Sequence, residues 1–299
     1  MYCPSTALAL SMHMHQVMIP EWRWRNENGV GEPLLRRVAA ENLHIVTSGG
    51  SDWIDSSGSV EKVEGGYKFT ARKVFSSGSP SGDILLTSAI LDDPTDGPTV
   101  LHFPISLKAE GVTILDTWRT MGMRATGSND IAIEDVFVPE AAIGGRRPKG
   151  KYGIFHLVAQ IALPLLYSVY VGIAEQARDI ARDRAQRRRE DPDVRLNVGE
   201  MENQLRLAQL ALEKSMTLAE QATPSPETTN EVVILRTLIG NAAIATVEKA
   251  MEVAGGSAFY RSLGLERLFR DVQAAKFHPL QEKRQLEYTG RFTLGMDID

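Results

Sequence analysis

Three short stretches of the first half combine hydroxyl, aromatic and arginine side chains with glycine. Residues 46–52 read Val-Thr-Ser-Gly-Gly-Ser-Asp, residues 72–78 read Arg-Lys-Val-Phe-Ser-Ser-Gly and residues 121–128 read Met-Gly-Met-Arg-Ala-Thr-Gly-Ser. Hydroxyls donate and accept hydrogen bonds, an aromatic ring stacks on another flat ring, and glycine lets a backbone come close to a ligand. These residue types therefore fit a binding site for a planar ligand, although each stretch also fits a strand end that enters a turn.

The second half contributes an arginine run, a double glycine and one histidine. The run 184–189 includes Arg188, whose planar guanidinium could grip phosphate oxygens, although a solvated helix end is an equally good interpretation. Gly255-Gly256 follows a helical pattern and allows backbone conformations that a side chain would forbid. His278 precedes a proline, where it is either a group for proton and hydrogen-bond chemistry or only a residue at a helix break.

The elements that must position these residues change type along the chain. Short alternating runs between Gly, Ser, Asp and Pro predict strands at 44–47, 67–74, 84–90, 100–107 and 131–138. Apolar residues at helical spacing predict helices at 7–17, 154–188, 197–222, 231–254 and 280–294. The pattern predicts an α+β chain with helical fragments at 1–42, a β domain at 43–150 and a helical bundle at 151–299, in which residues 280–294 provide the fourth helix.

Composition excludes several classes of protein. The chain has 299 residues and a formal net charge of -5, which argues against a nucleic-acid partner. One cysteine, Cys3, excludes an internal disulfide, no Cys/His spacing predicts a metal site, and no secretory signal is evident, so we expect a cytoplasmic protein. Residues 157–174 are apolar enough to suggest a membrane span, but a core helix is favoured and no span is expected.

Several strings resemble the acyl-CoA dehydrogenase superfamily of flavoproteins. Residues 255–271 resemble its Gly-Gly loop and the Arg-Asp pair that follows, and residues 121–139 closely resemble its Met-Gly-x-Arg-x-Thr-Gly-Ser…Asp-Val-x-Val-Pro strand pair. Residues 172–177 look like its Gly-x-Ala-x-x-Ala helix. The resemblance covers nearly the whole chain and implies a remnant of an N-terminal helical domain, a β-barrel-like middle domain and a C-terminal four-helix bundle.

The resemblance implies FAD, or alternatively FMN, as cofactor. The loop 46–52 is two residues shorter than the family's Thr-Glu-Pro-Gly-x-Gly-Ser-Asp loop, and Asp191 and Glu252 stand where the family has an aromatic residue and often a glutamine. The implied flavin contacts are Thr47, Phe75, Ser77, Arg188, Gly255 and Gly256, and the implied substrate contacts are Ser51 and Arg124.

The catalytic base is where the chain departs most from this family. Acyl-CoA dehydrogenases remove a substrate proton with a glutamate, but the two family positions fall at Pro279 and near Ala162, in a run without Asp or Glu. His278 instead resembles the flavin monooxygenase branch, in which a histidine in this region faces the flavin. Such a histidine could hydrogen-bond a peroxide group or take a proton from a phenolic substrate.

Three functions follow from the resemblance. The family default is a flavin-dependent oxidoreductase acting on the CH-CH group of an acyl-CoA-like substrate, with an electron-transfer flavoprotein as partner. The alternatives are a two-component monooxygenase fed by a flavin reductase, and a non-catalytic subunit that completes a partner's flavin site. Family chains carry further helices before the position of Met1, and these form one wall of the flavin and substrate pocket. We therefore expect that wall to come from a partner chain in a homo-oligomer, a dimer or a tetramer, or from an upstream segment.

Overall fold

The computed structural model describes residues 3–151 and 153–298, without the side chains of residues 153 and 154. The chain divides into two compact units. Of the described residues, the β unit contains 9–119, 126–151 and 153–155, and the helical unit contains those up to 8, 120–125 and 156–298. The predicted division into three parts at residues 42 and 150 stays a prediction, because a division of the chain by its internal contacts does not test the domain boundaries that the family resemblance implies.

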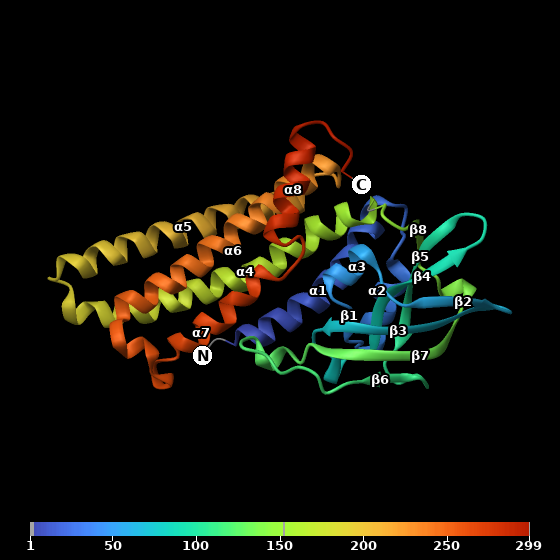
Figure 1. Cartoon of the computed structure of the whole chain (residues 1–299), viewed down its shortest axis with the longest axis horizontal. Helices are drawn as coiled ribbons and strands as arrows, with labels where there is room; N and C mark the ends of the chain where they lie inside the picture. The colour runs from blue at the N-terminus through green and yellow to red at the C-terminus, as the bar shows by residue number, and fades with distance from the viewer. Residues whose placement is uncertain (1–2, 152, 299) are drawn as a thin grey trace. The chain divides into compact units, whose positions relative to one another are not determined.

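The β unit is built on one mixed eight-stranded sheet (Figure 1). Its strand order is β6-β7-β3-β2-β4-β5-β8, and β1 pairs with β4 in parallel. Phe69 and Phe103 stack at the centre of its core, with ring centroids 3.7 Å apart. The strands are β1 Ile45–Thr47, β2 Ser59–Val63, β3 Gly66–Ser76, β4 Ile84–Asp93, β5 Gly97–Ser106, β6 Val112–Ile114, β7 Asn129–Pro139 and β8 Gly145–Pro148.

All five predicted strands are present, as β1, β3, β4, β5 and β7. The alternation of buried and exposed residues in β3 is the pattern of a strand with one face on a core. The strands β2, β6 and β8, of three to five residues each, were not predicted.

Three helices precede or interrupt the sheet: α1 Pro4–Asn26, α2 Glu32–Glu41 and α3 Gly50–Asp55. The predicted helix 7–17 is therefore shorter than α1, which continues through Pro20. The loop predicted at residues 46–52 is also partly wrong, because its second half is the first turn of α3. A Gly-Gly-Ser-Asp string favours a loop by local propensity, so contacts elsewhere in the unit must hold this turn.

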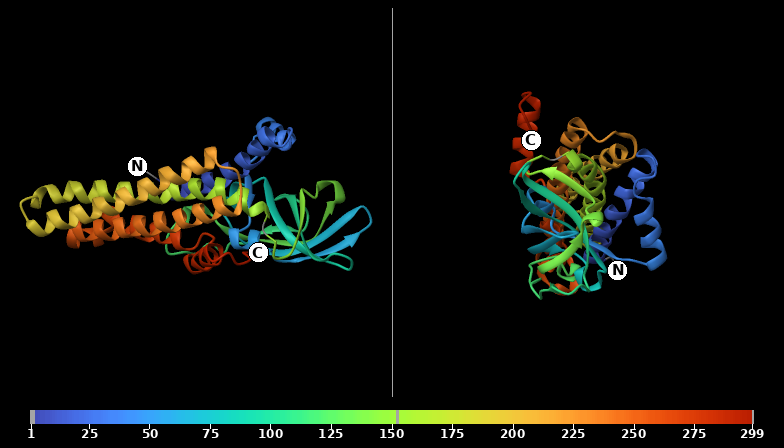
Figure 2. Two further views of the ribbon diagram at one scale, coloured as in Figure 1. Left: turned by 90° about the horizontal axis from the view of Figure 1, so that it is seen from above. Right: turned by 90° about the vertical axis from the view of Figure 1, so that its right-hand side faces the viewer.

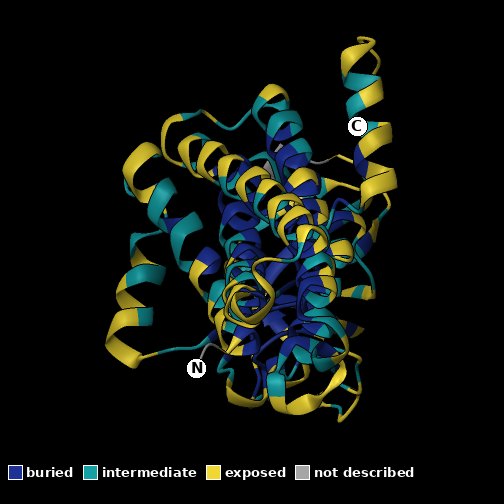
Figure 3. Cartoon of the chain, turned by 90° about the vertical axis from the view of Figure 1, so that its left-hand side faces the viewer, coloured by how far each residue is buried: buried dark blue, intermediate teal, exposed yellow. Residues whose placement is uncertain are grey.

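The helical unit contains α4 Gly153–Ala185, α5 Pro192–Gln221, α6 Pro226–Ala254, α7 Leu265–Val272 and α8 Glu282–Thr293 (Figure 2). Asp191 and Ser225 cap α5 and α6 by accepting backbone N–H bonds, and a proline follows each cap. The helix α5 buries one side and exposes the other, whereas α4 and α6 are buried over most of their length (Figure 3). Both α7 and α8 contact α6, so α7 shares with α8 the place that was expected for residues 280–294 as the fourth helix of the bundle.

Two helical stretches, 155–188 and 226–259, are long and apolar enough to cross a membrane. Their most apolar windows are 78% and 67% buried within the protein. This burial is typical of core helices, and it extends the expectation made for residues 157–174 to a second helix.

Candidate functional site

The candidate residues fall into two groups, one in each unit. Thr47, Ser51, Phe75 and Ser77 belong to the β unit. Arg124, Arg188, Gly255, Gly256 and His278 belong to the helical unit. Each group is described by itself.

The end of β1 and the bulged end of β3 lie against each other in the β unit. Thr47 is the last residue of β1 and is buried. The N–H of Gly49 donates to the carbonyl of Val74 at 2.8 Å, and a Cβ on Gly49 would lie 3.2 Å from the Cβ of Phe75. Glycine at position 49 is thus explained by close approach of two chain segments. Ser51 lies in the first turn of α3.

Phe75 is an exposed aromatic residue in an unusual backbone conformation. Its φ is 57°, a left-handed value that costs energy for any residue except glycine. The pairing of β3 with β7 shifts register between Lys73 and Ser76, and this bulge turns the side chain outward, where 56% of Phe75 is exposed. Trp118 meets the ring edge-on at 6.0 Å. The bulge therefore presents a fixed aromatic face.

A chain of three buried hydroxyls starts at Ser77. Its Oγ lies 2.8 Å from the Oγ of Ser128, which lies 2.7 Å from the Oγ1 of Thr126. The Gly78 N–H also donates to the Thr126 carbonyl at 2.8 Å. The two partners hold the Ser77 hydroxyl in one orientation. Sequence reasoning assigned neither of them a role, although both lie in the Thr-Gly-Ser string of the 121–128 motif.

A buried ion pair anchors α3 to the sheet. The Nζ of Lys73 is 3.0 Å from each carboxylate oxygen of Asp52 and also donates to the carbonyls of Ser57 and Ser88, at 2.8 and 2.6 Å. The two charged side chains are 0% and 6% exposed. Burial lowers the pKa of Lys73, and the Asp52 charge opposes that shift. Sequence reasoning missed this pair, whose only signal was the charged residue in each strand-end string.

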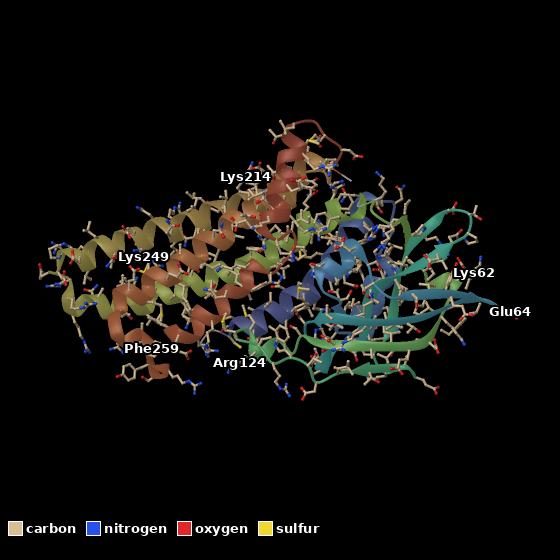
Figure 4. The ribbon with its side chains drawn as sticks, viewed as in Figure 1. Lys62, Glu64, Arg124, Lys214, Lys249 and Phe259 are labelled. Atoms are coloured by element: carbon tan, nitrogen blue, oxygen red, sulfur yellow. The ribbon has the colours of Figure 1, made fainter. Side chains whose placement is uncertain are left out.

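The arginine and the glycines of the helical unit meet at the end of α6. The Arg188 Nη2 donates to the carbonyl of Val253 at 2.7 Å and lies 3.8 Å from the position that a Cβ on Gly255 would take. Gly255 caps α6 with φ 64°, and open space surrounds the Cβ position of Gly256. The side chain of Phe259, in the turn that follows, is 86% exposed (Figure 4). Arg188 and the double glycine are thus brought together at the end of α6.

Two of the family-like strings dock on each other within the helical unit. The carboxylate of Asp271 accepts the Met123 N–H at 2.6 Å, and Arg270 donates to the Met121 carbonyl at 2.8 Å. A Cβ on Gly122 would lie 2.2 Å from the carbonyl oxygen of Arg270. The Arg-Asp pair therefore holds the Met-Gly-Met segment. Arg124, which follows it, is exposed and donates from Nε to the Thr120 carbonyl (Figure 4).

His278 lies in an aromatic cluster. Its Nε2 is 2.6 Å from the hydroxyl of Tyr170, and Tyr167 meets the ring edge-on at 6.1 Å. Burial, and secondly the positive charge of Arg236, lowers the pKa of His278 to about 4. The imidazole is therefore neutral near pH 7. It suits hydrogen bonding better than taking a proton from a substrate, because a base works best with a pKa near the operating pH.

The family departures have structural explanations. Asp191 is the N-cap of α5, where a carboxylate accepts the Asp193 N–H. Glu252 pairs with Lys249 at 2.8 Å. Ala162, near one expected base position, is a buried residue of α4. Among the described residues, no group of three His, Cys, Asp or Glu side chains could hold a metal ion.

Comparison with known proteins agrees with this arrangement. Residues 165–282 match the family "Acyl-CoA dehydrogenase, C-terminal domain". A pigment production hydroxylase of Rhodococcus sp. is 27% identical over 99% of this chain and 80% of its own length. The putative acyl-CoA dehydrogenase YdbM of Bacillus subtilis is 30% identical over 73% of this chain and 58% of its own length. The structure of KijD3 with FMN and a dTDP-linked amino keto sugar superposes with a TM-score of 0.86, at 25% identity over 98% of this chain and 76% of that one.

The fold and the docked motifs define a protein of the class of flavin-dependent oxidoreductases. Its residues 165–282 match the C-terminal domain family of the acyl-CoA dehydrogenases, and its fold is that of the acyl-CoA dehydrogenase-like superfamily. Within that superfamily, one relative that matches along nearly the whole chain is a hydroxylase, whereas the putative dehydrogenase matches along a shorter part. The default expectation of acyl-CoA dehydrogenation is therefore less well supported than its monooxygenase alternative.

Proposed function

We propose that the protein is the oxygenase component of a two-component flavin-dependent monooxygenase, which receives reduced flavin from a separate flavin reductase. One observation carries this proposal: His278, held by Tyr170, stands beside the position where an acyl-CoA dehydrogenase has its glutamate base. Because burial lowers its pKa to about 4, the neutral imidazole of His278 is a weak base near pH 7. It can hydrogen-bond a polar oxygen group, as oxygen chemistry requires.

The residues of each unit fit a flavin. In the β unit, the outward face of Phe75 would stack on the ring system, and the Ser77 hydroxyl, oriented by Ser128, would hydrogen-bond its edge. In the helical unit, the guanidinium of Arg188 lies beside Gly255, where it would bind a phosphate of the flavin. When bound in its reduced form, the flavin would supply the electrons that activate oxygen.

Substrate and cofactor follow from the same residues. Ser51 and Arg124 are proposed as substrate contacts, and the exposed guanidinium of Arg124 suits an anionic group. The cofactor is proposed to be FMN or FAD. A homo-oligomer, a dimer or a tetramer, is proposed as the working form, since the family resemblance implies further helices around the flavin that a partner chain could supply.

The test is rapid mixing of the protein with reduced FMN or FAD, followed by oxygen. We expect the absorbance of the bound flavin to change in two phases and the slower phase to be lost in His278→Ala, but not in His44→Ala, a change in the β unit. Anaerobic bleaching of bound oxidised flavin by an acyl-CoA would overturn the proposal in favour of the dehydrogenase. Failure to bind either flavin in either redox state would leave only the non-catalytic subunit.

A further inference from the structure

Arg236 of α6 is a buried cation without a carboxylate partner among the described ion pairs. The residue is 3% exposed, and its Nη2 donates to three backbone carbonyls, those of Ala275, Lys276 and His278, at 3.0, 3.4 and 2.6 Å. Its guanidinium also lies 5.2 Å from the ring centroid of Tyr167. A buried charge held only by neutral groups costs several kcal/mol, so its position calls for an explanation.

The guanidinium organises the turn that carries His278. The hydroxyl of Tyr167 in α4 donates a hydrogen bond to the Ala275 carbonyl at 2.7 Å. Tyr167 of α4 and Arg236 of α6 therefore hydrogen-bond to the same turn. Tyr170, less than one helical turn from Tyr167, reaches the imidazole itself. The backbone and the side chain of His278 are thus held separately, the first by Arg236 and the second by Tyr170.

The hydrogen bond between Tyr170 and His278 has a preferred direction. A phenol is a stronger acid than a neutral imidazole N–H, and an imidazole nitrogen is a better acceptor than a phenol oxygen. The hydroxyl therefore donates to Nε2, and the ring proton resides on Nδ1. Among the described residues, no hydrogen bond engages Nδ1, so that edge of the ring has a donor to offer.

We propose that Tyr170 and Arg236 are positioning residues that hold His278 as a neutral ring with its proton on Nδ1, ready to donate to an oxygen acceptor. The inference rests on the proposed function for the identity of that acceptor. Two carboxylates of neighbouring helices also act electrostatically on this cluster: Asp271 of α7 on Tyr170, and Glu282 of α8 on Arg236. The guanidinium disfavours an added proton on the ring, and the phenol fixes the tautomer.

The experiment is nitrogen NMR of the full-length, cofactor-free protein labelled at histidine. We expect His278 to remain neutral, with Nε2 as acceptor, from about pH 8 down to about pH 5. In Tyr170→Phe the tautomers should mix, and in Arg236→Met the titration midpoint should rise, because the guanidinium charge is the second cause of the low pKa of His278. Tyr260→Phe, a change at an exposed tyrosine of the same unit, should alter neither property.

A wild-type ring with its proton on Nε2, or an unaltered tautomer in Tyr170→Phe, would overturn the inference. If Arg236→Met does not fold, Arg236→Lys keeps the charge and should retain the low midpoint while losing part of the grip on the turn. Because no flavin is present, these outcomes are independent of the proposed function. The pH profile of the slow phase with bound flavin then provides the link, since Tyr170→Phe should shift it and Tyr260→Phe should not.

Discussion

Replacing Gly122 by alanine places a methyl group where there is no room for it. The new Cβ would lie 2.2 Å from the oxygen and 2.5 Å from the carbon of the Arg270 carbonyl, and 2.8 Å from the Asp271 nitrogen. All three are backbone atoms, so no rotamer change relieves the clash. The segment must move away from α7, which weakens the 2.6 Å bond from the Met123 N–H to the Asp271 carboxylate.

The cost can be set from these two effects. Overpacking costs about 1–3 kcal/mol, and a lost hydrogen bond to a charged group costs about 1.5–3 kcal/mol. We expect a destabilisation of about 3 kcal/mol or more, which lowers Tm by roughly 6–12 °C for a protein of this size.

Urea unfolding followed by circular dichroism, together with calorimetry, measures this loss. Gly199→Ala is the matched control, because position 199 lies in α5 with open space around its Cβ position. That variant should gain about 0.5–1 kcal/mol, since alanine favours a helix. If Gly122→Ala stays within about 0.5 kcal/mol of the wild type while the control shows its gain, the docking of the Met-Gly-Met segment on α7 is wrong.

Three further predictions concern the β unit. Asp52→Asn should lower the free energy of unfolding by about 3–5 kcal/mol, because it leaves Lys73 buried without a countercharge. The control Asp130→Asn, which breaks the exposed pair with Arg72, should lower it by less than about 1 kcal/mol. Equal losses for the two variants in urea unfolding would contradict the burial argument. Burial lowers the pKa of His15 to about 4, so the native state binds fewer protons than the unfolded state, and stability should fall as the pH drops from about 6.5 to 4. That slope should be shallower in His15→Gln, and an identical slope would remove His15 as its cause. Phe75→Ala should weaken flavin binding about tenfold through lost stacking, measured by fluorescence titration, while Phe137→Ala, at another exposed phenylalanine, should not; equal affinities for the two variants would exclude stacking on Phe75.

The long elements were predictable because each shows its own period. The helices α5 and α6 carry apolar residues at helical spacing, and each begins at a capping residue followed by a proline. The strand β3 alternates because one of its faces meets the core. The helix α3 was not predictable, because its stability depends on Asp52 meeting Lys73, a residue of a different strand-end string.

The candidate site was predictable in part. Arg188 and Gly255 were chosen from separate strings, and the structure brings them together at the end of α6. The hydroxyl chain behind Ser77 was missed, since Ser77 and Ser128 are 51 residues apart in sequence and no local pattern joins them.

By itself, the sequence determined the superfamily and the absence of the usual glutamate, because both are matters of which residue occupies a counted position. It also placed a histidine, His278, next to one of these counted positions, Pro279. Only the tertiary structure decided the state of that histidine. Tyr170 is 108 residues from His278 in sequence, and Arg236 is 42 residues away. A pKa depends on the charges and the solvent around a group, and folding alone brings this phenol and this guanidinium to the ring.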